Sequence, residues 1–250
     1  MRLQLATWPE VETYLKDSTG IIIPIGSTEQ HGPTGFVGTD ALTAEGIAHH
    51  LGARHGIMVA PTISVGMAQH HLGFPGSMTL RPSTLIAVIR DTVESLARHG
   101  FDRMFFINGH GGNIATANAA FNEVYAERSL APASNRPSVR CVMRNWFTCP
   151  GVMELAKELY GDADGSHATA SEVALTYHLF PEDAARVRTA PLSPEIAPNG
   201  SIFDAEDYRR SFPDGRIGSN PALAEAEHGA RFLEIATQEL AQQYQEFVNA

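Results

Sequence analysis

The sequence predicts an α/β fold in which helices cover both faces of a mostly parallel sheet. Apolar runs of strand length alternate with stretches of helical periodicity along most of the 250-residue chain. The first run, residues 21–25, is apolar at nearly every position, as expected of a strand buried on both faces. Two of the runs lead directly into glycine-rich polar stretches, and parallel sheets bind ligands beyond the carboxyl ends of their strands. We therefore expect a functional site at that edge of the sheet.

The individual elements follow from periodicity and from the residues that start and stop helices. Strands are predicted over residues 21–25, 56–60, 103–107 and 139–146, and helices over residues 8–17, 40–55, 81–99, 114–128, 151–160 and 168–179. Thr39 or Asp40 suits the N-cap of the second helix. Asn220 and Pro221 predict the N-cap and first residue of a last helix that runs to about Phe247.

The connecting segments are of three kinds. Residues 64–80 form a long irregular loop with aromatic and apolar residues, which is typical of a functional loop. Residues 131–138 are predicted to be a surface linker. Residues 181–220 are rich in Pro, Gly and Asp and are predicted to be mostly loop. No repeat interrupts the pattern, so residues 1–250 are expected to form one domain.

Composition excludes several classes of protein. A hydrophobic content of 43% supports a core, and a net charge of -10 argues against non-specific binding to nucleic acid. No apolar stretch reaches the length of a membrane span, and the N-terminus lacks the apolar segment of a signal peptide. Two cysteines, Cys141 and Cys149, are too few for a disulfide scaffold. A cytoplasmic protein that binds neither membrane nor nucleic acid is predicted.

The first polar stretch, residues 26–40, carries Glu29, His31 and Asp40. In an extended segment Glu29 and His31 point to the same side, because side chains alternate along a strand. Carboxylate and imidazole groups are ligands that zinc, manganese and iron accept. Strand ends also carry such residues for other reasons, so this stretch alone leaves a metal site and an ordinary polar loop as alternatives.

The second polar stretch, residues 108–113, places His110 between two glycines directly after a strand. A helix-initiating turn with a structural histidine is one interpretation, and a phosphate-binding loop is another. The stretch contains neither Lys nor Arg, which makes a nucleotide loop a poor fit. Because it follows its strand on the same side of the sheet as the first stretch, we prefer a metal ligand.

A third motif, residues 164–172, contains His167 and Glu172. Glu172 has a simple interpretation as a solvated or helix-capping acid. The residues after it are apolar, however, and a carboxylate on a largely buried helix needs a partner. A metal ion would supply that partner.

The count of candidate ligands exceeds one tetrahedral site with an open position. Three carboxylates and two imidazoles suit two divalent ions that share a bridging carboxylate and a hydroxide. Such a pair generates a nucleophile from water near neutral pH and polarises a carbonyl group. His167 is then a candidate proton shuttle, because an imidazole titrates near pH 7.

These stretches resemble the creatininase (creatinine amidohydrolase) family. The matching segments are GSTEQHGPTGFVGTD over residues 26–40, HLGFPGS over residues 71–77, NGHGGN over residues 108–113 and SHATASE over residues 166–172. The resemblance implies a three-layer α/β/α domain, hydrolysis of an amide-type C–N bond, and two divalent ions, usually zinc or manganese and iron in some relatives. It also implies a homohexamer built as a trimer of dimers.

The resemblance assigns roles to individual residues. It places Glu29, His31, Asp40 and His110 on ligand positions, with Asp40 as the bridge, and His167 on the histidine proposed for proton transfer. The chain departs from the pattern of true creatininases at Gly112, where true creatininases carry a further glutamate ligand. We assign that missing role to Glu172.

A second departure concerns the third motif, where Thr169 and Ala170 replace a Gly-Glu pair common in the family. Both departures argue against creatinine itself as the substrate. Relatives with the GHGGN form include deformylases of formamidopyrimidine nucleotides and peptidases of peptide-cofactor maturation.

The sequence thus predicts a metal-dependent amidohydrolase that acts on a small-molecule amide with a non-peptide C–N bond. His71, Phe74 and Trp146 are predicted to contact the substrate, although Trp146 could equally belong to the core. A deformylase of a phosphorylated heterocycle is the second candidate, and it requires Arg81 or Arg144 to bind phosphate. A non-catalytic metal-binding protein on the same fold is the alternative of a different class.

Overall fold

The computed structural model describes residues 1–130, 138–188 and 190–250. Its central sheet has the strand order β2-β1-β3-β4, and every pairing between these strands is parallel. The strands are β1 (Gly20–Ile25), β2 (Met58–Val59), β3 (Arg103–Asn108) and β4 (Arg140–Asn145). The predicted parallel sheet is confirmed, and its second strand is shorter than the sequence suggests.

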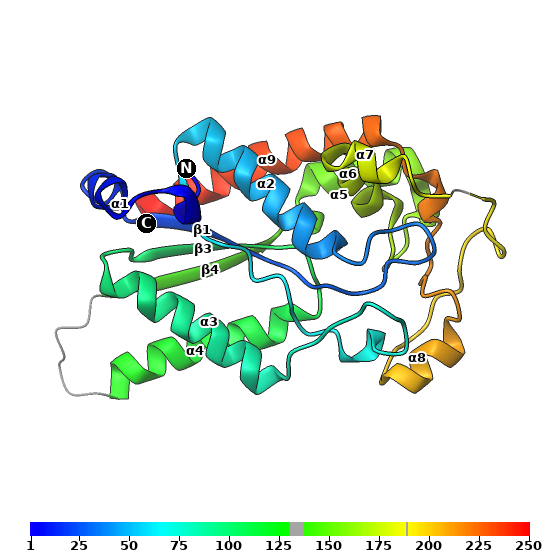
Figure 1. Ribbon diagram of the computed structural model, residues 1–250, viewed down its shortest axis with the longest axis horizontal. Coiled ribbons are helices and arrows are strands. Elements are labelled where there is room, and N and C mark those ends of the chain that lie inside the picture. Colours follow the sequence, from blue (N-terminus) through cyan, green and yellow to red (C-terminus); the bar gives the residue numbers. More distant parts are fainter. Residues whose placement is uncertain (131–137, 189) are drawn as a thin grey trace.

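Helices cover the sheet on both faces and give three layers (Figure 1). One face is covered by α2 (Thr39–His55), α5 (Pro150–Tyr160), α6 (Ala170–Leu179) and α9 (Ala226–Asn249), and the other by α3 (Pro82–Arg98) and α4 (Asn113–Leu130). The shorter elements are α1 (Trp8–Tyr14), α7 (Pro181–Ala184), α8 (Ala205–Ser211) and the single 3-10 turns η1 (Leu3–Leu5), η2 (Gln69–His71), η3 (Trp146–Thr148), η4 (Gly161–Ala163) and η5 (Pro221–Leu223). The predicted α/β/α architecture is therefore confirmed.

The alternation of side chains along β1 explains why both faces are buried. Ile22 packs into the core under α2 and α9, whereas Ile21, Ile23 and Ile25 pack into the core over α3 and α4. All four isoleucines are fully buried, and burial of one such side chain contributes about 1.5–3 kcal/mol. This strand fixes the position of the polar loop that follows it.

The structure corrects three predicted helix starts. Gly38, rather than Thr39 or Asp40, is the N-cap of α2. The Thr39 hydroxyl donates to the carbonyl of Phe36, and the Asp40 carboxylate faces His31 and His110. The α6 helix begins at Ala170 rather than Ala168, which has a left-handed backbone with φ of 54°.

The last helix also begins later than predicted. Asn220 does act as a cap, since its side chain accepts from the amide of Ala222, but it caps only the turn η5. Ala224 is extended, and α9 starts at Ala226.

Two connecting segments need comment. Residues 131–137 of the predicted linker lie outside the described residues. The segment predicted to be loop over residues 181–220 contains the two short helices α7 and α8, which Figure 1 shows beside the carboxyl end of the sheet. Within the described part of the chain, no helix is both long enough and apolar enough to cross a membrane.

Candidate metal centre

The loops after β1 and β3 bring four of the predicted ligands together at the carboxyl edge of the sheet. Glu29 and His31 lie in the β1–α2 loop, Asp40 lies in the first turn of α2, and His110 lies between β3 and α4. Each is at most 7% exposed. Four buried polar side chains in one cluster require partners, because an unpaired buried charge is strongly unfavourable.

Asp40 lies between two groups of candidate ligands. Its Oδ1 is 3.0 Å from Nε2 of His31, and its Oδ2 is 3.1 Å from Nδ1 of His110. Nδ1 of His110 is also 3.3 Å from Oε1 of Glu29. One oxygen of the carboxylate therefore faces each group.

Glu172 completes the group around His31 from a different element. It is the third residue of α6, where its Oε1 accepts from the amide of Thr169 in a capping box. Its Oε2 lies 3.8 Å from Nε2 of His31. Glu172 is thus both a helix-capping acid, as the simple interpretation held, and a member of the cluster.

Each imidazole of the cluster is oriented by a main-chain carbonyl. His31 contacts the carbonyl of Glu29 through Nδ1 at 3.0 Å, and His110 contacts the carbonyl of Met67 through Nε2 at 2.9 Å. The carbonyl accepts a proton from that nitrogen, so the other ring nitrogen is the one that faces the carboxylates. Ligating histidines are commonly held in this way.

Glycines allow the two loops to touch. A Cβ on Gly109 would overlap the main-chain oxygen of Asp40, and a Cβ on Gly26 would overlap the main chain between Asp40 and Ala41. A Cβ on Gly112 would overlap Nε2 of His110. The third contact means that no side chain fits at position 112 in this arrangement, so a ligand cannot come from there.

The buried charged groups in the cluster shift one another's pKa values. Burial opposes a positive charge on His31, but Asp40, Glu172 and Glu29 outweigh it and raise the pKa of His31 to about 10. Burial also opposes the charge on His110, whereas Glu29 and Asp40 raise its pKa to about 9. Burial raises the pKa of Glu172 to about 7, with partial relief from His31. Without a metal ion, bound protons on two histidines balance the carboxylates.

Unsatisfied atoms show that the cluster fits a cation. Among the described residues, both carboxylate oxygens of Glu29 and Oδ2 of Asp40 are buried without a well-aligned hydrogen bond, and the neighbours of Oε1 and Oδ2 are imidazole nitrogens at 3.0–3.3 Å. Potential ligand atoms fall into compact groups, each within 4.8 Å: Glu29, Asp40 and His110; His31, Asp40 and Glu172; and Glu29, His31 and His167. The mixture of carboxylate and imidazole suits zinc or manganese.

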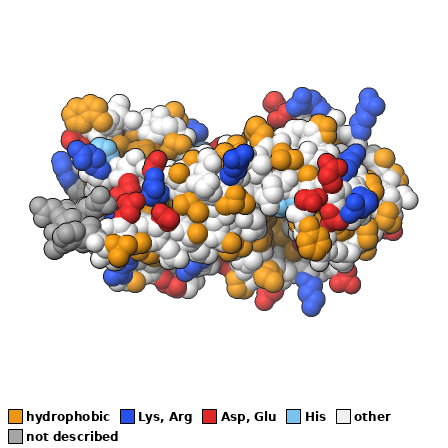
Figure 2. Space-filling view, turned by 90° about the horizontal axis from the view of Figure 1, so that it is seen from below, with side chains coloured by type: hydrophobic (Ala, Val, Ile, Leu, Met, Phe, Trp, Pro, Cys, Tyr) orange, Lys and Arg blue, Asp and Glu red, His pale blue; other side chains and the backbone are white. Residues whose placement is uncertain are grey.

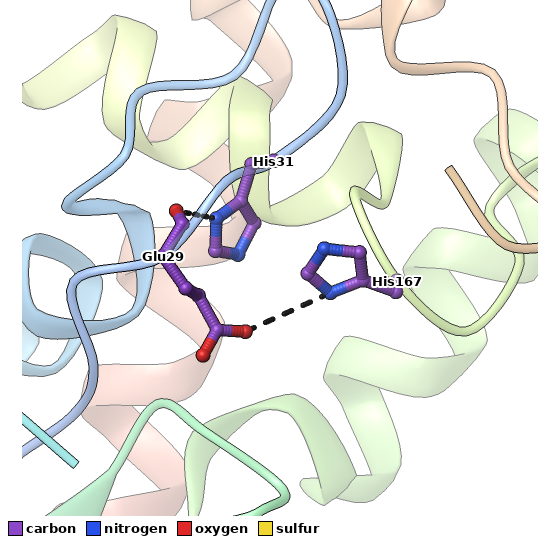
Figure 3. Close-up of side chains that lie close together, drawn as sticks. All are labelled: Glu29, His31 and His167. Atoms are coloured by element: carbon purple, nitrogen blue, oxygen red, sulfur yellow. Dashed lines mark hydrogen bonds and ion pairs between the residues drawn. The ribbon is translucent and has the colours of Figure 1, made fainter. Parts of the chain in front are cut away.

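His167 lies beside the cluster on the α5–α6 connection. Its Nδ1 is 3.9 Å from Oε1 of Glu29, and its ring faces that of His31 with 4.8 Å between centroids (Figure 3). Its Nε2 lies 2.9 Å from the carbonyl of Gln30. Burial, together with His71 and His31, lowers the pKa of His167 well below its usual value, so the ring is neutral at neutral pH.

A cavity of about 970 Å³ opens onto this cluster. Asp40, His110, Glu172 and His167 line it, and so does His71. Figure 2 shows a hollow on one face of the molecule with histidine at its edge, and the Lys and Arg side chains on that face are interspersed with Asp and Glu. The site is accessible to a small molecule.

The three predicted substrate contacts have different positions. His71 lines the cavity, but it is 1% exposed and its Nε2 lies 3.0 Å from Oε1 of Glu29. Phe74 packs edge-on against Tyr208 and Trp146 lies in the core under α5 and α9, so both are outside the lining. The structure gives no support to substrate contacts by Phe74 and Trp146.

Sequence reasoning gave no role to Gln30 or Tyr208. The side-chain nitrogen of Gln30 lies 3.0 Å from Nδ1 of His71 and 3.1 Å from the hydroxyl of Tyr208, which itself donates to the carbonyl of Gly215. Gln30 lies within a quoted motif, so its position offered a signal. Tyr208 belongs to α8, where no local pattern marks it.

Comparison with known proteins agrees with this geometry. The chain matches the family model described as creatininase, creatinine amidohydrolase, over residues 4–244. The creatinine amidohydrolase of Pseudomonas putida is 26% identical, across 94% of this chain and 92% of the relative. The 3-dehydro-scyllo-inosose hydrolase of Thermotoga maritima is 27% identical, across 87% and 70%. The mycofactocin precursor peptide peptidase of Mycolicibacterium smegmatis is 29% identical, across 85% and 79%.

Solved structures of similar shape include a manganese creatininase, with a TM-score of 0.81, 23% identity and coverage of 100% of this chain and 99% of the other. A mutant creatininase of the Zn-Zn type gives a TM-score of 0.80 at 23% identity, with coverage of 100% and 98%. These likenesses establish the fold.

Proposed function

The chain belongs to the creatininase family, and on that premise we propose that it is a dinuclear metal-dependent amidohydrolase that cleaves a C–N bond of a small or cyclic amide. The observation that carries the proposal is the position of Asp40, whose two carboxylate oxygens face two separate groups of ligand atoms. A carboxylate in that position can serve as a bridge between two ions.

The proposed ligands follow from the two groups. Glu29, Asp40 and His110 would hold one ion, and His31, Asp40 and Glu172 the other. When bound, a pair of divalent ions polarises a carbonyl group and lowers the pKa of a water molecule to near neutrality. Zinc and manganese are proposed, because both suit this donor set and both occur in the structurally similar creatininases.

His167 is proposed as the group that moves protons. The side-chain nitrogen of Gln30 also lies 2.9 Å from Nε2 of His167, but it has His71 and Gly215 as acceptors for its two protons. In the proposed tautomer the neutral ring therefore donates from Nε2 to the carbonyl of Gln30, and Nδ1 is free to take a proton on the side of the cluster. It can then donate that proton to the nitrogen that departs when the C–N bond breaks. His71 is proposed to line the substrate cavity and to support Glu29.

The charge of the cavity favours an amide without a phosphate group. Arg81 and Arg144, which a phosphate pocket would require, are exposed and are not among the residues that line the cavity. Among the described lining residues, Lys157 is the one Lys or Arg side chain, and Asp162 and Asp164 also line the cavity. A deformylase of a phosphorylated heterocycle is therefore the weaker candidate. A homohexamer and a cytoplasmic location stay predictions of the family resemblance.

The proposal is tested by metal content together with turnover. Protein washed with chelator and reloaded with zinc or manganese should hold about two equivalents of metal. It should hydrolyse at least one compound in a panel of creatinine, other cyclic amides, formamides and short peptides. The panel includes peptides because one relative is a peptide peptidase.

A variant separates an enzyme from a metal-binding protein without catalysis. His167→Ala should keep the metal and lose turnover, whereas His55→Ala, at an exposed position at the end of α2, should change neither. Metal binding without turnover of any amide would favour the non-catalytic alternative. Protein that binds less than one equivalent would refute the metal centre.

A further inference from the structure

Arg216 is a fully buried arginine whose hydrogen bonds join two short segments of the chain, residues 194–195 and residues 214–219. Its Nε and Nη2 contact Oδ2 of Asp214 at 2.9 and 2.8 Å. Its Nη1 donates to the carbonyls of Glu195 and Ser219, at 3.1 and 3.0 Å, and its Nη2 donates to the carbonyl of Pro194 at 2.9 Å. A buried guanidinium with its donors satisfied in this way fixes the shape of the surrounding backbone.

The second of these segments, residues 214–219, holds the main chain of His167. Ile217 accepts from the amides of Ser166 and His167, at 3.0 and 3.4 Å, and donates to the carbonyl of His167 at 3.3 Å. The hydroxyl of Ser219 donates to the same carbonyl at 2.6 Å. We name residues 214–219 the Arg216 clamp, because Ile217 and Ser219 hold the main chain of His167 through these hydrogen bonds.

The backbone beside His167 needs such support. Ala168 has φ of 54°, a left-handed conformation that residues with a Cβ rarely adopt. A strained residue of this kind persists only where its surroundings leave no alternative. A Cβ on Gly165 would overlap the main chain of Gly218, so the two segments are in close backbone contact just before the strained residue.

The clamp also touches the loop that carries the proposed ligands. A Cβ on Gly32 would lie 2.9 Å from Cγ of Arg216, so the arginine stem lies against the residue after His31. None of the proposed metal ligands belongs to residues 214–219. The clamp therefore sets the distance between His167 and the cluster without contributing a ligand.

We propose that Arg216 is a positioning residue, which through Ile217 and Ser219 holds His167 so that Nδ1 faces the metal cluster (Figure 3). The inference rests on the proposed role of His167 in proton transfer. Loss of the clamp lets Ala168 relax to an ordinary conformation and turns the imidazole away from Glu29. Proton transfer then slows while the metal ligands keep their places.

Two variants and a matched control test the proposal. Arg216→Lys keeps the charge but cannot reach the same set of carbonyls, because an ammonium lacks the planar fork of a guanidinium. Ser219→Ala removes one hydroxyl and its hydrogen bond to His167, and it keeps the proposal testable if the lysine variant fails to fold. The control is Thr176→Val, which removes another fully buried hydroxyl whose carbonyl partner, Val173, lies within α6.

The first readout does not depend on activity. Carbon–proton correlation spectra of the histidine rings, in metal-free and zinc-loaded protein, should show one His167 resonance in the unaltered protein. That resonance should shift or broaden in Arg216→Lys and Ser219→Ala, while the His31 resonance and the whole spectrum of Thr176→Val stay unchanged. A His167 resonance that is unchanged in both clamp variants would overturn the proposal, whether or not an amide substrate is found.

The second readout uses an amide that the protein hydrolyses. The clamp variants should lower kcat about tenfold or more, as expected for a displaced catalytic group, with KM within about twofold of the unaltered protein. Zinc content should stay the same. A parallel fall in zinc content and Tm that accounts for the lost activity would show that the clamp acts on stability alone, and would also overturn the proposal.

Discussion

The two halves of the cluster are held in different ways. Glu29, His31, Asp40 and His110 follow two central strands, and glycine contacts press their loops together. Glu172 and His167 belong to the segment before and within α6, which is held by a capping box and by the Arg216 clamp. The first half is fixed by the buried sheet, and the second by hydrogen bonds between side chains and main chain.

Because the two halves are held differently, we expect them to respond differently to substitution. The sheet-edge half supplies most of the proposed metal ligands and follows the buried strands β1 and β3. The α6 half supplies one proposed ligand and the proton-transfer residue, both held by contacts that single substitutions can remove. Changes in the first half should abolish the centre, and changes in the second half should alter it.

The largest effect is expected at Asp40, the residue common to both groups. Asp40→Asn should weaken zinc binding at least about hundredfold, beyond the range typical of a residue that only supports a ligand, and should abolish turnover. Equilibrium competition with a chromophoric chelator measures the affinity. Asp91→Asn, at a side chain that is 71% exposed on α3, is the control. Retention of two ions by Asp40→Asn would refute the bridging role.

A smaller effect is expected at Glu172, because it belongs to one group only. Glu172→Gln should lower zinc content from about two equivalents to about one, since glutamine can still act in a capping box but is a poor ligand. Thr169→Ala removes the capping hydroxyl, should cost about 1 kcal/mol of stability and should keep both ions. If Glu172→Gln held both ions, Glu172 would be a capping residue alone.

The pH dependence of stability separates the metal-free from the loaded protein. In the metal-free state His31 and His110 have pKa values raised to about 10 and about 9, so their contribution to stability is complete below their ordinary value of 6.5. That contribution is lost as pH rises through about 9 and 10. We expect the Tm of metal-free protein to fall over this range and that of zinc-loaded protein to fall less. Equal falls in both would contradict the interpretation.

The smallest effect is expected at Ala168. A left-handed residue with a Cβ costs about 1–2 kcal/mol, whereas glycine adopts this conformation freely but loses more entropy on folding. Ala168→Gly should therefore raise the free energy of unfolding by at most about 1 kcal/mol, as measured by urea denaturation. A clear loss of stability would show that the methyl group packs more favourably than its backbone is strained.

The sequence predicted the sheet-edge half well because its signals are local. A buried strand followed by a polar loop can be recognised from consecutive residues, and parallel strands place such loops at one edge. Glu29, His31, Asp40 and His110 were grouped on this basis, and the structure brings them together.

The site residues and helix starts that the sequence did not predict depend on contacts or backbone conformations that no local pattern encodes. Arg216 and Tyr208 lie in a segment predicted to be mostly loop. Tyr208 accepts from the side chain of Gln30, far earlier in the sequence, and Arg216 donates to the carbonyl of Pro194 across a connection that has no regular pattern. Phe74 and Trp146 were predicted to contact substrate from their position after a loop or strand, but an aromatic side chain in such a place packs equally well into the core. Three helix starts were misplaced because Gly38, Ala168 and Ala224 have backbone conformations that sequence pattern does not reveal.

The double use of Glu172 has a consequence for biosynthesis. The ribosome releases Glu29, His31, Asp40 and His110 well before α6 emerges, and Glu172 reaches His31 only after that helix is capped and docked. The group of His31, Asp40 and Glu172 is therefore incomplete on a growing chain. We expect the proposed ion of this group to bind only after α6 has emerged and docked, later than an ion held by Glu29, Asp40 and His110.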